Sequence, residues 1–432
     1  MFRWFGKIIG TNVLLKVTSY NAIGIAVRMV TGLIVSKAVA FFLGSSGMAL
    51  LGELRNFLSS VHSLSILGIK NGIIKYVAEH KDNRAELKNV LTTSLALNVG
   101  AAIVVGLVIF FGAPYWNDVV FSDNQDFVFA FRLIGICLPA FMLFMYGTAV
   151  INGLGKYKMV VNIGIATNAI ALLVTLLLIY FERVHGAIIA LILGPVINLI
   201  CILVILLYRR VNVFEWLSPK GIKNSYIKKL LSYTGMTLFS SIFTPWIYIG
   251  IRQKIIDTQS LTSAGYWDAM VRVSDYYMMF VTTLLTLYIL PKLSSIDNDK
   301  DFRKEIGNFM KTVIPIFIAG GALIFLLKGV IIRTIFTTEF LAMKPIFIWQ
   351  LLGDLMRVAS TVLAYQFVAK NMFWHFTITN IISLAVIYFS SSFFVERYGF
   401  TGASMGHFVS YTFYLIMMLL IFRKPLFRFK SS

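Results

Sequence analysis

The chain has 432 residues, of which 58% are hydrophobic and 13% charged, and its mean hydropathy is +0.81. This composition excludes a soluble globular protein and indicates a protein that crosses a membrane several times. The net charge of +20 does not indicate nucleic-acid binding, because the basic residues lie mostly in short loops and not on one polar domain.

The first residues mix aromatic with basic side chains. Phe2, Trp4 and Phe5 alternate with Arg3 and Lys7. Two interpretations of this segment, 1–16, are equally consistent with the sequence: a helix in the membrane interface, or a frayed cytoplasmic start. The apolar stretch that follows is too long for the core of a signal peptide, so we expect it to be the first membrane span.

Twelve apolar stretches are long enough to cross a membrane as helices. They cover 17–43, 47–77, 89–113, 126–151, 158–181, 186–208, 228–252, 263–291, 308–328, 345–369, 374–395 and 401–422. The sequence therefore predicts an all-α polytopic membrane protein. We expect a six-helix lobe at 17–208, a linker at 209–227, a second six-helix lobe at 228–422 and a basic tail at 423–432.

The loops between these stretches alternate in charge. The N-terminus, 79–88, 155–158, 209–229, 292–311 and 423–430 carry most of the Lys and Arg found outside the spans, and the intervening loops carry few. The positive-inside rule places the basic loops and both termini in the cytoplasm. This is the orientation expected of a multi-pass protein of the bacterial inner membrane.

The two halves of the chain repeat each other. Lys156, Glu182 and Arg183 recur as identical residues 214 positions later, and Ser19–Tyr20 and Gly52 recur at a shift of 213. Because each half has six spans, the two copies have the same orientation. Such parallel repeats are typical of transporters that bind substrate near the middle of the membrane.

Eight basic residues inside the predicted spans are candidates for function, against four acids. A charged side chain at the bilayer centre costs about 2.5–3.5 kcal/mol on insertion scales, so these residues must face a wet cavity or a partner. The basic residues are Arg28, Lys37, Arg55, Lys70, Lys75, Arg132, Arg272 and Arg357, and the acids are Glu53, Asp268, Asp275 and Asp354. The surplus of positive charge indicates an anionic substrate.

The first span carries Arg28 and Lys37, which lie about 13 Å apart along a helix. We interpret both as part of a cationic lining, although Lys37 alone can also extend to the outer headgroups. On the second span, Arg55 is near mid-depth and has no simple structural explanation. These three residues are our first candidates for substrate binding.

The lower part of the second span carries further polar residues. His62 can carry a proton, but a buried structural histidine is the more common case. Asn71 follows Lys70, between two glycines at 68 and 72. Lys75, near the cytoplasmic edge, suits phosphate capture and headgroup anchoring equally well.

Charges in the second half are spaced for pairing. Asp268, Arg272 and Asp275 follow one helical face, and Asp354 and Arg357 are three residues apart. These are either neutralising ion pairs or, for Asp275 and Asp354, carriers of a coupling ion. Near the outward ends of their spans, Arg132 and Arg252 are by default interfacial anchors.

No enzyme or cofactor motif is present in the sequence. Cys137 and Cys201 both fall in apolar stretches, so we infer neither a disulfide nor a metal site. The segment 153–158 (GLGKYK) lacks the spacing of a nucleotide-binding loop, and no zinc-protease, redox or hydrolase motif occurs. We therefore expect a transporter without cofactor, and any drive from ATP would need a separate subunit.

Several segments resemble the Wzx-type O-antigen translocases of the MOP flippase superfamily, and most of all their lipid III flippase (WzxE-like) type. They are RMVTGLIVSK (28–37), ELRNFLSS (53–60), IKNGIIKYVAEHKDN (69–83), SDYY (274–277), YILPKLS (288–294) and WQLLGD (349–354). The resemblance covers nearly the whole chain. It implies two lobes of six helices, a V-shaped cationic cavity and alternating access without ATP.

The resemblance also implies site residues. Positions with the same or a like-charged residue in the family are Arg28, Lys37, Arg55, Asn71, Lys75, Arg132, Arg252, Trp267, Asp275 and Asp354, and Arg357 matches a basic position. The first eight are predicted to bind substrate. Asp275, Asp354 and Arg357, together with Asp268, Arg272 and His62, are predicted to serve ion coupling or gating. Lys70, Asp268 and Arg272 depart from the family pattern.

Three functions are candidates for such a chain. The first is a flippase that moves an undecaprenyl-pyrophosphate-linked oligosaccharide outward, with its lipid tail in the bilayer through a lateral gap, with or without coupling to protons or sodium, and with a glycan polymerase and chain-length machinery as partners. The second, an ion-coupled multidrug exporter, would need carboxylates in the cavity to bind cationic drugs. The third, a membrane glycan polymerase or ligase, would need larger outward loops. The surplus of Arg and Lys favours the first.

Overall fold

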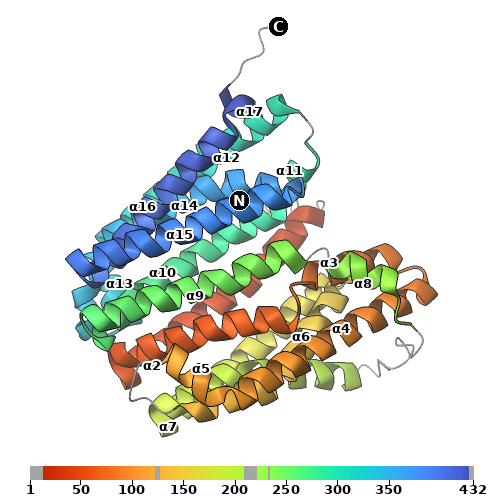
Figure 1. The fold of residues 1–432 in the computed structure, drawn as a ribbon, viewed down its shortest axis with the longest axis horizontal. Coiled ribbons are helices and arrows are strands. Elements are labelled where there is room, and N and C mark those ends of the chain that lie inside the picture. The colour runs from red at the N-terminus through yellow and green to blue at the C-terminus, as the bar shows by residue number, and fades with distance from the viewer. Residues whose placement is uncertain (1–12, 122–126, 209–220, 232–233, 297, 428–432) are drawn as a thin grey trace, which may run out of the picture. The chain divides into compact units, whose positions relative to one another are not determined.

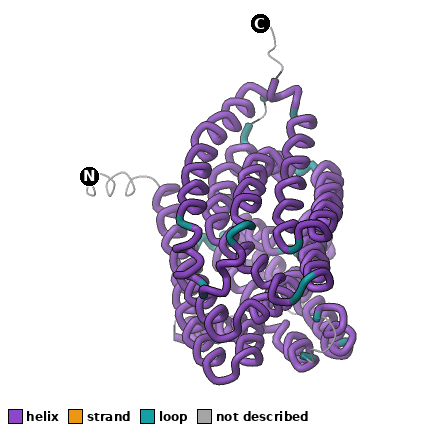
Figure 2. Tube along the Cα trace, turned by 90° about the vertical axis from the view of Figure 1, so that its left-hand side faces the viewer, coloured by secondary structure: helices purple, strands orange, loops and turns teal. Residues whose placement is uncertain are grey.

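The computed structural model describes residues 13–121, 127–208, 221–231, 234–296 and 298–427. Every regular element in these ranges is a helix (Figure 2). Most of the predicted interfacial segment and most of the predicted linker lie outside the described residues, as does the end of the basic tail. The all-α prediction is confirmed for the part of the chain that the structure describes.

In the described residues, the first part of the chain contains six helices before the linker and two from its end onward (Figure 1). They are α2 (Val13–Ser65), α3 (Lys70–His80), α4 (Arg84–Phe111), α5 (Ala113–Val120), α6 (Val128–Gly153), α7 (Tyr157–Tyr208), α8 (Asn224–Leu231) and α9 (Thr234–Thr258). The second half continues with α10 (Leu261–Leu284), the π-helical turn η2 (Leu285–Ile289), α11 (Leu290–Ser294), α12 (Asp299–Leu326), α13 (Lys328–Ile335), the 3₁₀ turn η3 (Thr338–Met343), α14 (Ile346–Ala369), α15 (Phe373–Tyr398), α16 (Phe400–Ile421) and α17 (Arg423–Phe427).

Two of the helices are interrupted. Helix α2 breaks at Gly44, where φ is 68°, and α7 breaks at Arg183, where φ is 50°. In the described residues, nine helices are long and apolar enough to cross a membrane, and the first of them runs on from α2 through α3. Dividing α2 and α7 at their breaks and adding α9 gives twelve segments. That each crosses the membrane separately stays a prediction.

Helix bounds display the internal repeat. Helices α4 and α12 each have 28 residues, and α5 and α13 each have eight. Both pairs are offset by 215 positions, close to the shift seen in the sequence. Two short helices that no hydropathy argument predicts therefore recur at matching places.

The second predicted span differs from a single helix. Between Ser65 and Lys70 the chain turns, with positive φ at Leu67 (49°) and Gly68 (64°). The N–H of Gly68 donates to the carbonyl of Ser63 at 3.3 Å, which closes the end of α2 as left-handed caps do. Lys70 thus begins α3 instead of lying within a continuous helix.

The helices pack into two compact units. One comprises Met1–Ala38 and Glu53–Trp246, and the other Val39–Gly52 and Ile247–Ser432. The lobe bounds at 208 and 228 that the sequence suggests stay predictions. In the second unit, Gly52 and Gly265, a pair matched in the repeat, let α2 and α10 approach closely: a Cβ at 265 would lie 1.9 Å from the Ser45 carbonyl oxygen.

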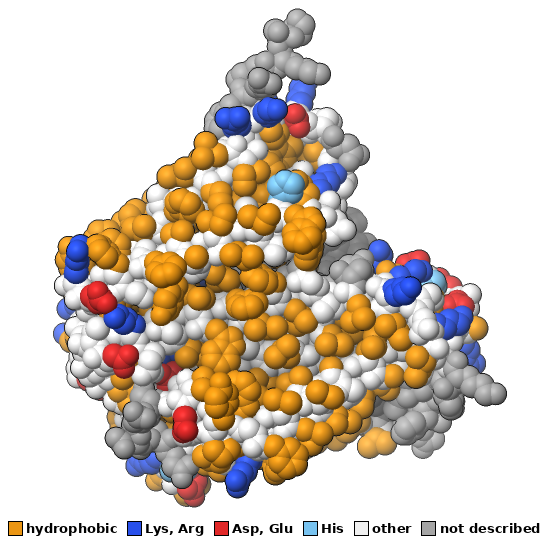
Figure 3. Space-filling model, viewed as in Figure 1, with side chains coloured by type: hydrophobic (Ala, Val, Ile, Leu, Met, Phe, Trp, Pro, Cys, Tyr) orange, Lys and Arg blue, Asp and Glu red, His pale blue; other side chains and the backbone are white. Residues whose placement is uncertain are grey.

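The face of the molecule in Figure 3 shows where charge lies along the helices. Hydrophobic side chains cover their middle parts, and Lys, Arg, Asp and Glu gather toward their ends. Large apolar side chains such as Phe111 (76%) and Leu326 (78%) are mostly exposed. An apolar band between charged ends is the surface that a lipid bilayer requires.

Candidate functional site

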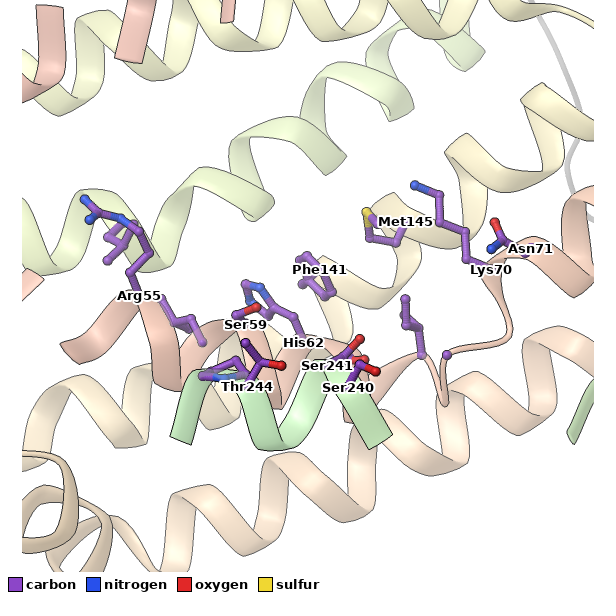
Figure 4. Close-up of a pocket in the computed structure, with 16 residues that line it drawn as sticks. Arg55, Ser59, His62, Lys70, Asn71, Phe141, Met145, Ser240, Ser241 and Thr244 are labelled. Carbon is purple, nitrogen blue, oxygen red and sulfur yellow. The ribbon is translucent and has the colours of Figure 1, made fainter. Parts of the chain in front are cut away.

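A cavity of about 800 Å³ lies within the first unit, and we call it the anion pocket (Figure 4). It is formed by the second part of α2, the turn after it, the start of α3, and faces of α6, α7 and α9. Its lining residues are Arg55, Leu58, Ser59, His62, Ser63, Ile66, Gly68, Lys70, Asn71, Phe141, Met145, Leu191, Ser240, Ser241, Thr244 and Pro245.

Two cations lie at opposite ends of the anion pocket. In Figure 4, Arg55 stands at one end, and Lys70 and Asn71 stand at the other. Arg55 and Lys70 are half-buried, whereas Asn71 is exposed. None of the sixteen described lining residues is acidic. The pocket therefore offers positive charge that no carboxylate in its lining neutralises.

The break before α3 adds a further source of positive potential. The residue before the helix, Ile69, provides no side-chain cap, so first-turn N–H groups have no capping side chain to bond. Lys70 and Asn71 are the first two residues of this turn and line the pocket. The uncapped start of an 11-residue helix beside a lysine suits the oxygens of a phosphate.

Hydroxyl groups line part of the pocket, beside apolar residues such as Leu58 and Leu191. Ser59 and Ser63 come from α2, and Ser240, Ser241 and Thr244 come from α9. Pro245 has no N–H to donate to the carbonyl of Ser241, four residues earlier in α9. Hydroxyls can both donate and accept hydrogen bonds, so this wall suits phosphate oxygens and sugar hydroxyls alike.

His62 lies between the two cations and stacks on Phe141. The two rings are 3.5 Å apart between centroids and nearly parallel, at 7°. Both residues line the anion pocket. This places the histidine where it can contact a ligand, and its coupling role stays a prediction.

Other predicted site residues of the first unit lie outside the lining. Arg28 is exposed on α2 and close enough to Lys70 for their charges to repel. Lys37 is half-buried, Lys75 is exposed with its ammonium 5.4 Å from the Tyr76 ring, and Arg132 is exposed on α6. Of the eight predicted substrate residues, the structure brings together only Arg55 and Asn71 here.

In the second unit, Arg252 forms a buried ion pair instead of an interfacial anchor. Its guanidinium lies 2.5 Å from Asp268, and it is 1% exposed. It also lies over the ring of Trp267, at 5.6 Å, and that ring is 3% exposed. Asp268 therefore pairs with α9, and not with Arg272 on its own helix as the spacing suggests. The substrate roles of Arg252 and Trp267 stay predictions.

Asp354, on α14, is fully buried in a network of hydrogen bonds. Its Oδ2 accepts from Ser274 at 2.5 Å and from the Tyr277 hydroxyl, while Nε2 of His407 lies 3.1 Å from Oδ1. The predicted partner Arg357 is 4.0 Å away. The network thus joins α10, α14 and α16 around one carboxylate. Asp275 is exposed on α10, and Arg272 is half-buried.

Sequence reasoning missed His407 and the α9 hydroxyls. The only local signal for His407 is Gly353, next to Asp354: a Cβ at 353 would lie 2.3 Å from the histidine ring, so the glycine makes room for it. Ser240, Ser241 and Thr244 carry no charge and gave no signal in an apolar stretch.

Comparison with known proteins places the chain in a family. A family model described as "Polysaccharide biosynthesis protein" matches residues 54–345, which include both Arg55 and Asp275. The chain belongs to this family. It is also 27% identical over 417 residues to the lipid III flippase of Escherichia coli (strain K12), covering 95% of this chain and 98% of that protein.

Solved structures show the fold of this polysaccharide biosynthesis protein. It superposes with a TM-score of 0.73 on an inward-facing multidrug resistance MATE family transporter of the MOP superfamily, 14% identical, covering 94% of this chain and 96% of that one. The lipid II flippase MurJ in an inward closed conformation gives 0.69 at 13% identity, covering 95% and 87%. The predicted MOP fold is confirmed.

Proposed function

We propose that this protein is a flippase that moves an undecaprenyl-pyrophosphate-linked oligosaccharide, an O-antigen or lipid III-like unit, from the cytoplasmic to the periplasmic leaflet of the bacterial inner membrane. The observation that carries the proposal is the anion pocket, with Arg55 and Lys70 and no acid in its described lining. The similarity to the lipid III flippase supports the same substrate class. The protein is a transporter and not an enzyme.

The pocket is matched to a pyrophosphate that carries a sugar. Arg55 can bind phosphate oxygens with two parallel N–H groups, and Lys70 supplies a point charge beside the helix start. Ser59, Ser240 and Ser241 offer hydrogen bonds to sugar hydroxyls. A cationic drug would find only repulsion from these two cations, so a multidrug exporter fits the pocket poorly.

The membrane potential favours the proposed direction. A pyrophosphate diester carries about two negative charges, and each charge that crosses 100 mV is worth about 2.3 kcal/mol. Outward movement from a negative interior is therefore favoured by at most about 4–5 kcal/mol. The basic loops in the cytoplasm and both termini on that side complete the proposed topology.

A proton is the coupling ion that the second unit suits better than sodium. Three of the groups around Asp354, from Ser274, Tyr277 and Gln350, point hydrogen-bond donors at its oxygens. A sodium ion would have to displace these donors from the carboxylate, whereas a proton can be exchanged with the His407 ring nitrogen, 3.1 Å from Oδ1. We therefore propose that Asp354 with His407 exchanges a proton, while Asp268, Asp275, Arg272, Arg357 and His62 serve gating.

The proposed partner proteins are the glycan polymerase and the chain-length machinery, which would act on the lipid-linked unit after it has crossed the membrane.

Neutralising the anion pocket tests the proposal. In Arg55→Gln and Lys70→Gln, purified protein should bind inorganic pyrophosphate about tenfold more weakly, because a charge-assisted hydrogen bond contributes about 1.5–3 kcal/mol. Surface glycan should fall in cells that depend on the variant. Arg55→Lys, which keeps the charge, should recover part of both.

Lys81→Gln is the matched control. Lys81 is exposed and directly follows α3, the helix that Lys70 begins. It should leave pyrophosphate binding and glycan output unchanged. Full glycan output from a normally expressed Arg55→Gln, Lys70→Gln double variant would rule out the pocket as the binding site.

A further inference from the structure

A second cavity lies in the same unit, and we call it the tail groove. Its volume is about 240 Å³, and it lies between α2, α4, α5 and α9. It is lined by Phe57, Ser60, Val61, Leu64, Val104, Val105, Val108, Ile109, Trp116 and Trp246. Ser60 is the one hydroxyl among these described residues, and it already donates to the carbonyl of Ile242 at 3.2 Å. The indole N–H of Trp116 likewise donates to the Val108 carbonyl, at 3.3 Å, so the groove offers little to a polar headgroup.

The tail groove and the anion pocket occupy opposite faces of α2. The pocket takes residues 55, 58, 59 and 62 of this helix, and the groove takes 57, 60, 61 and 64. A shift of two residues turns a helix by about 200°. On α9 the same division holds, with Thr244 and Pro245 on the pocket and Trp246 on the groove.

The two helices therefore form a wall between the cavities. They run beside each other (Figure 1) and are joined by the bond from Ser60 to the Ile242 carbonyl. On the groove side, the rings of Phe57 and Trp246 also contact each other, at 6.1 Å between centroids. A molecule with a charged end in the pocket and an apolar end in the groove would pass between α2 and α9.

The lining of the groove suits a branched, unsaturated hydrocarbon. The ring of Trp116 lies 5.6 Å from Phe57 and 6.3 Å from Trp246, so three aromatic side chains form one side of the groove. Val104 (61%) and Val108 (54%) are exposed at its edge, so the groove opens to the surroundings of the helix bundle. Aromatic faces and β-branched side chains pack well against methyl-bearing chains.

We propose that the tail groove binds the part of the isoprenoid chain nearest the pyrophosphate, while the pyrophosphate lies in the anion pocket. The inference rests on the proposed function, since it needs one ligand that is anionic at one end. The placement of the groove directly behind the pocket favours the substrate's own chain over bulk phospholipid. The hydrogen bond from Ser60 to the Ile242 carbonyl must break for the chain to pass between α2 and α9.

Photo-crosslinking of the full-length protein tests this site. The probe is a polyprenyl pyrophosphate with a benzophenone close to the pyrophosphate. It should label α4 or Trp246, and unlabelled undecaprenyl pyrophosphate should compete. In Val105→Trp, which fills the groove, labelling should fall about tenfold while inorganic pyrophosphate binds as in the unaltered protein. Ile103→Trp, at an exposed position on α4 outside the groove, should label normally.

Leu64→Trp fills the groove from α2 and guards against misfolding of a single variant. Unchanged labelling in both filled variants would overturn the inference, and so would loss of pyrophosphate binding in both. Competition by phosphatidylglycerol as strong as that by undecaprenyl pyrophosphate would overturn it as well, because bulk lipid would then occupy the groove. Pyrophosphate binding by the unaltered protein reports separately on the proposed function: labelling without it would contradict that function, not the groove.

Discussion

Asp354 illustrates what one buried residue can do in this protein. Its carboxylate is 0% exposed and receives hydrogen bonds from Ser274 and Tyr277, with His407 at 3.1 Å. Burial of an ion is costly unless such bonds compensate it. Because these donors and Arg357, 4.0 Å away, favour the ionised carboxylate, Asp354 can take up a proton only when the network rearranges.

Asp354→Asn should destabilise the protein. The amide would present its NH₂ group to donors and leave at least one of them without an acceptor, at a cost of about 1–3 kcal/mol. The midpoint of unfolding in a denaturing detergent titration measures this loss. Asp257→Asn, at an exposed position on α9, is the control and should change stability little. Equal stability of the two variants would contradict the network.

At this scale the sequence predicted charges better than their partners. The surplus of cations and the candidates Arg55 and Asp354 followed from the cost of burying charge. The pairing of Asp268 with Arg252, and not with Arg272, depends on how α9 packs on α10, which spacing along one helix cannot show. The roles of His407 and Ser240 depend likewise on packing between distant segments.

At the scale of elements, the break between α2 and α3 positions the anion pocket. Length and apolarity predict a continuous helix over 47–77, but Leu67 and Gly68 adopt left-handed backbone angles. A leucine in that conformation gives no sequence signal, because such angles are typical of glycine and asparagine. The break orients the start of α3 and Lys70 on the pocket.

Gly68→Ala should therefore lower stability by about 1–2 kcal/mol, because φ is +64° and an L-residue is strained there. Pyrophosphate binding should weaken as well if the turn reforms as helix. Gly100→Ala is the matched control: it lies within α4 with open space around a Cβ, so the same change should stabilise by about 0.5–1 kcal/mol. Effects of the same sign in both variants would argue against strain at Gly68.

At the scale of the whole molecule, charge is divided between the repeats. Six of the eight candidate basic residues lie in the first half of the chain, and three of the four candidate acids lie in the second. The two charged sites lie in different units of the structure: the anion pocket belongs to one unit, and the Asp354 network belongs to the other. The sequence alone predicted the repeat, and the helix bounds agree with its shift.

This division predicts that two driving forces can be separated. In proteoliposomes with fluorescent undecaprenyl pyrophosphate, a potential that is negative on the cytoplasmic side should drive the lipid to the other leaflet, and reversing the potential should drive it back, because about two charges cross the field. A pH gradient should add to this drive in the unaltered protein.

The variants separate the two driving forces. The Asp354→Asn protein should still respond to the potential, because it retains the cations that bind the anion. It should no longer respond to the pH gradient, because residue 354 has no proton to exchange. The Arg55→Gln, Lys70→Gln double variant should lose both, because it no longer holds the lipid. If transport by the unaltered protein does not depend on the sign of the potential, no net charge crosses the membrane with the lipid. If the pH response survives in Asp354→Asn, another residue exchanges the proton.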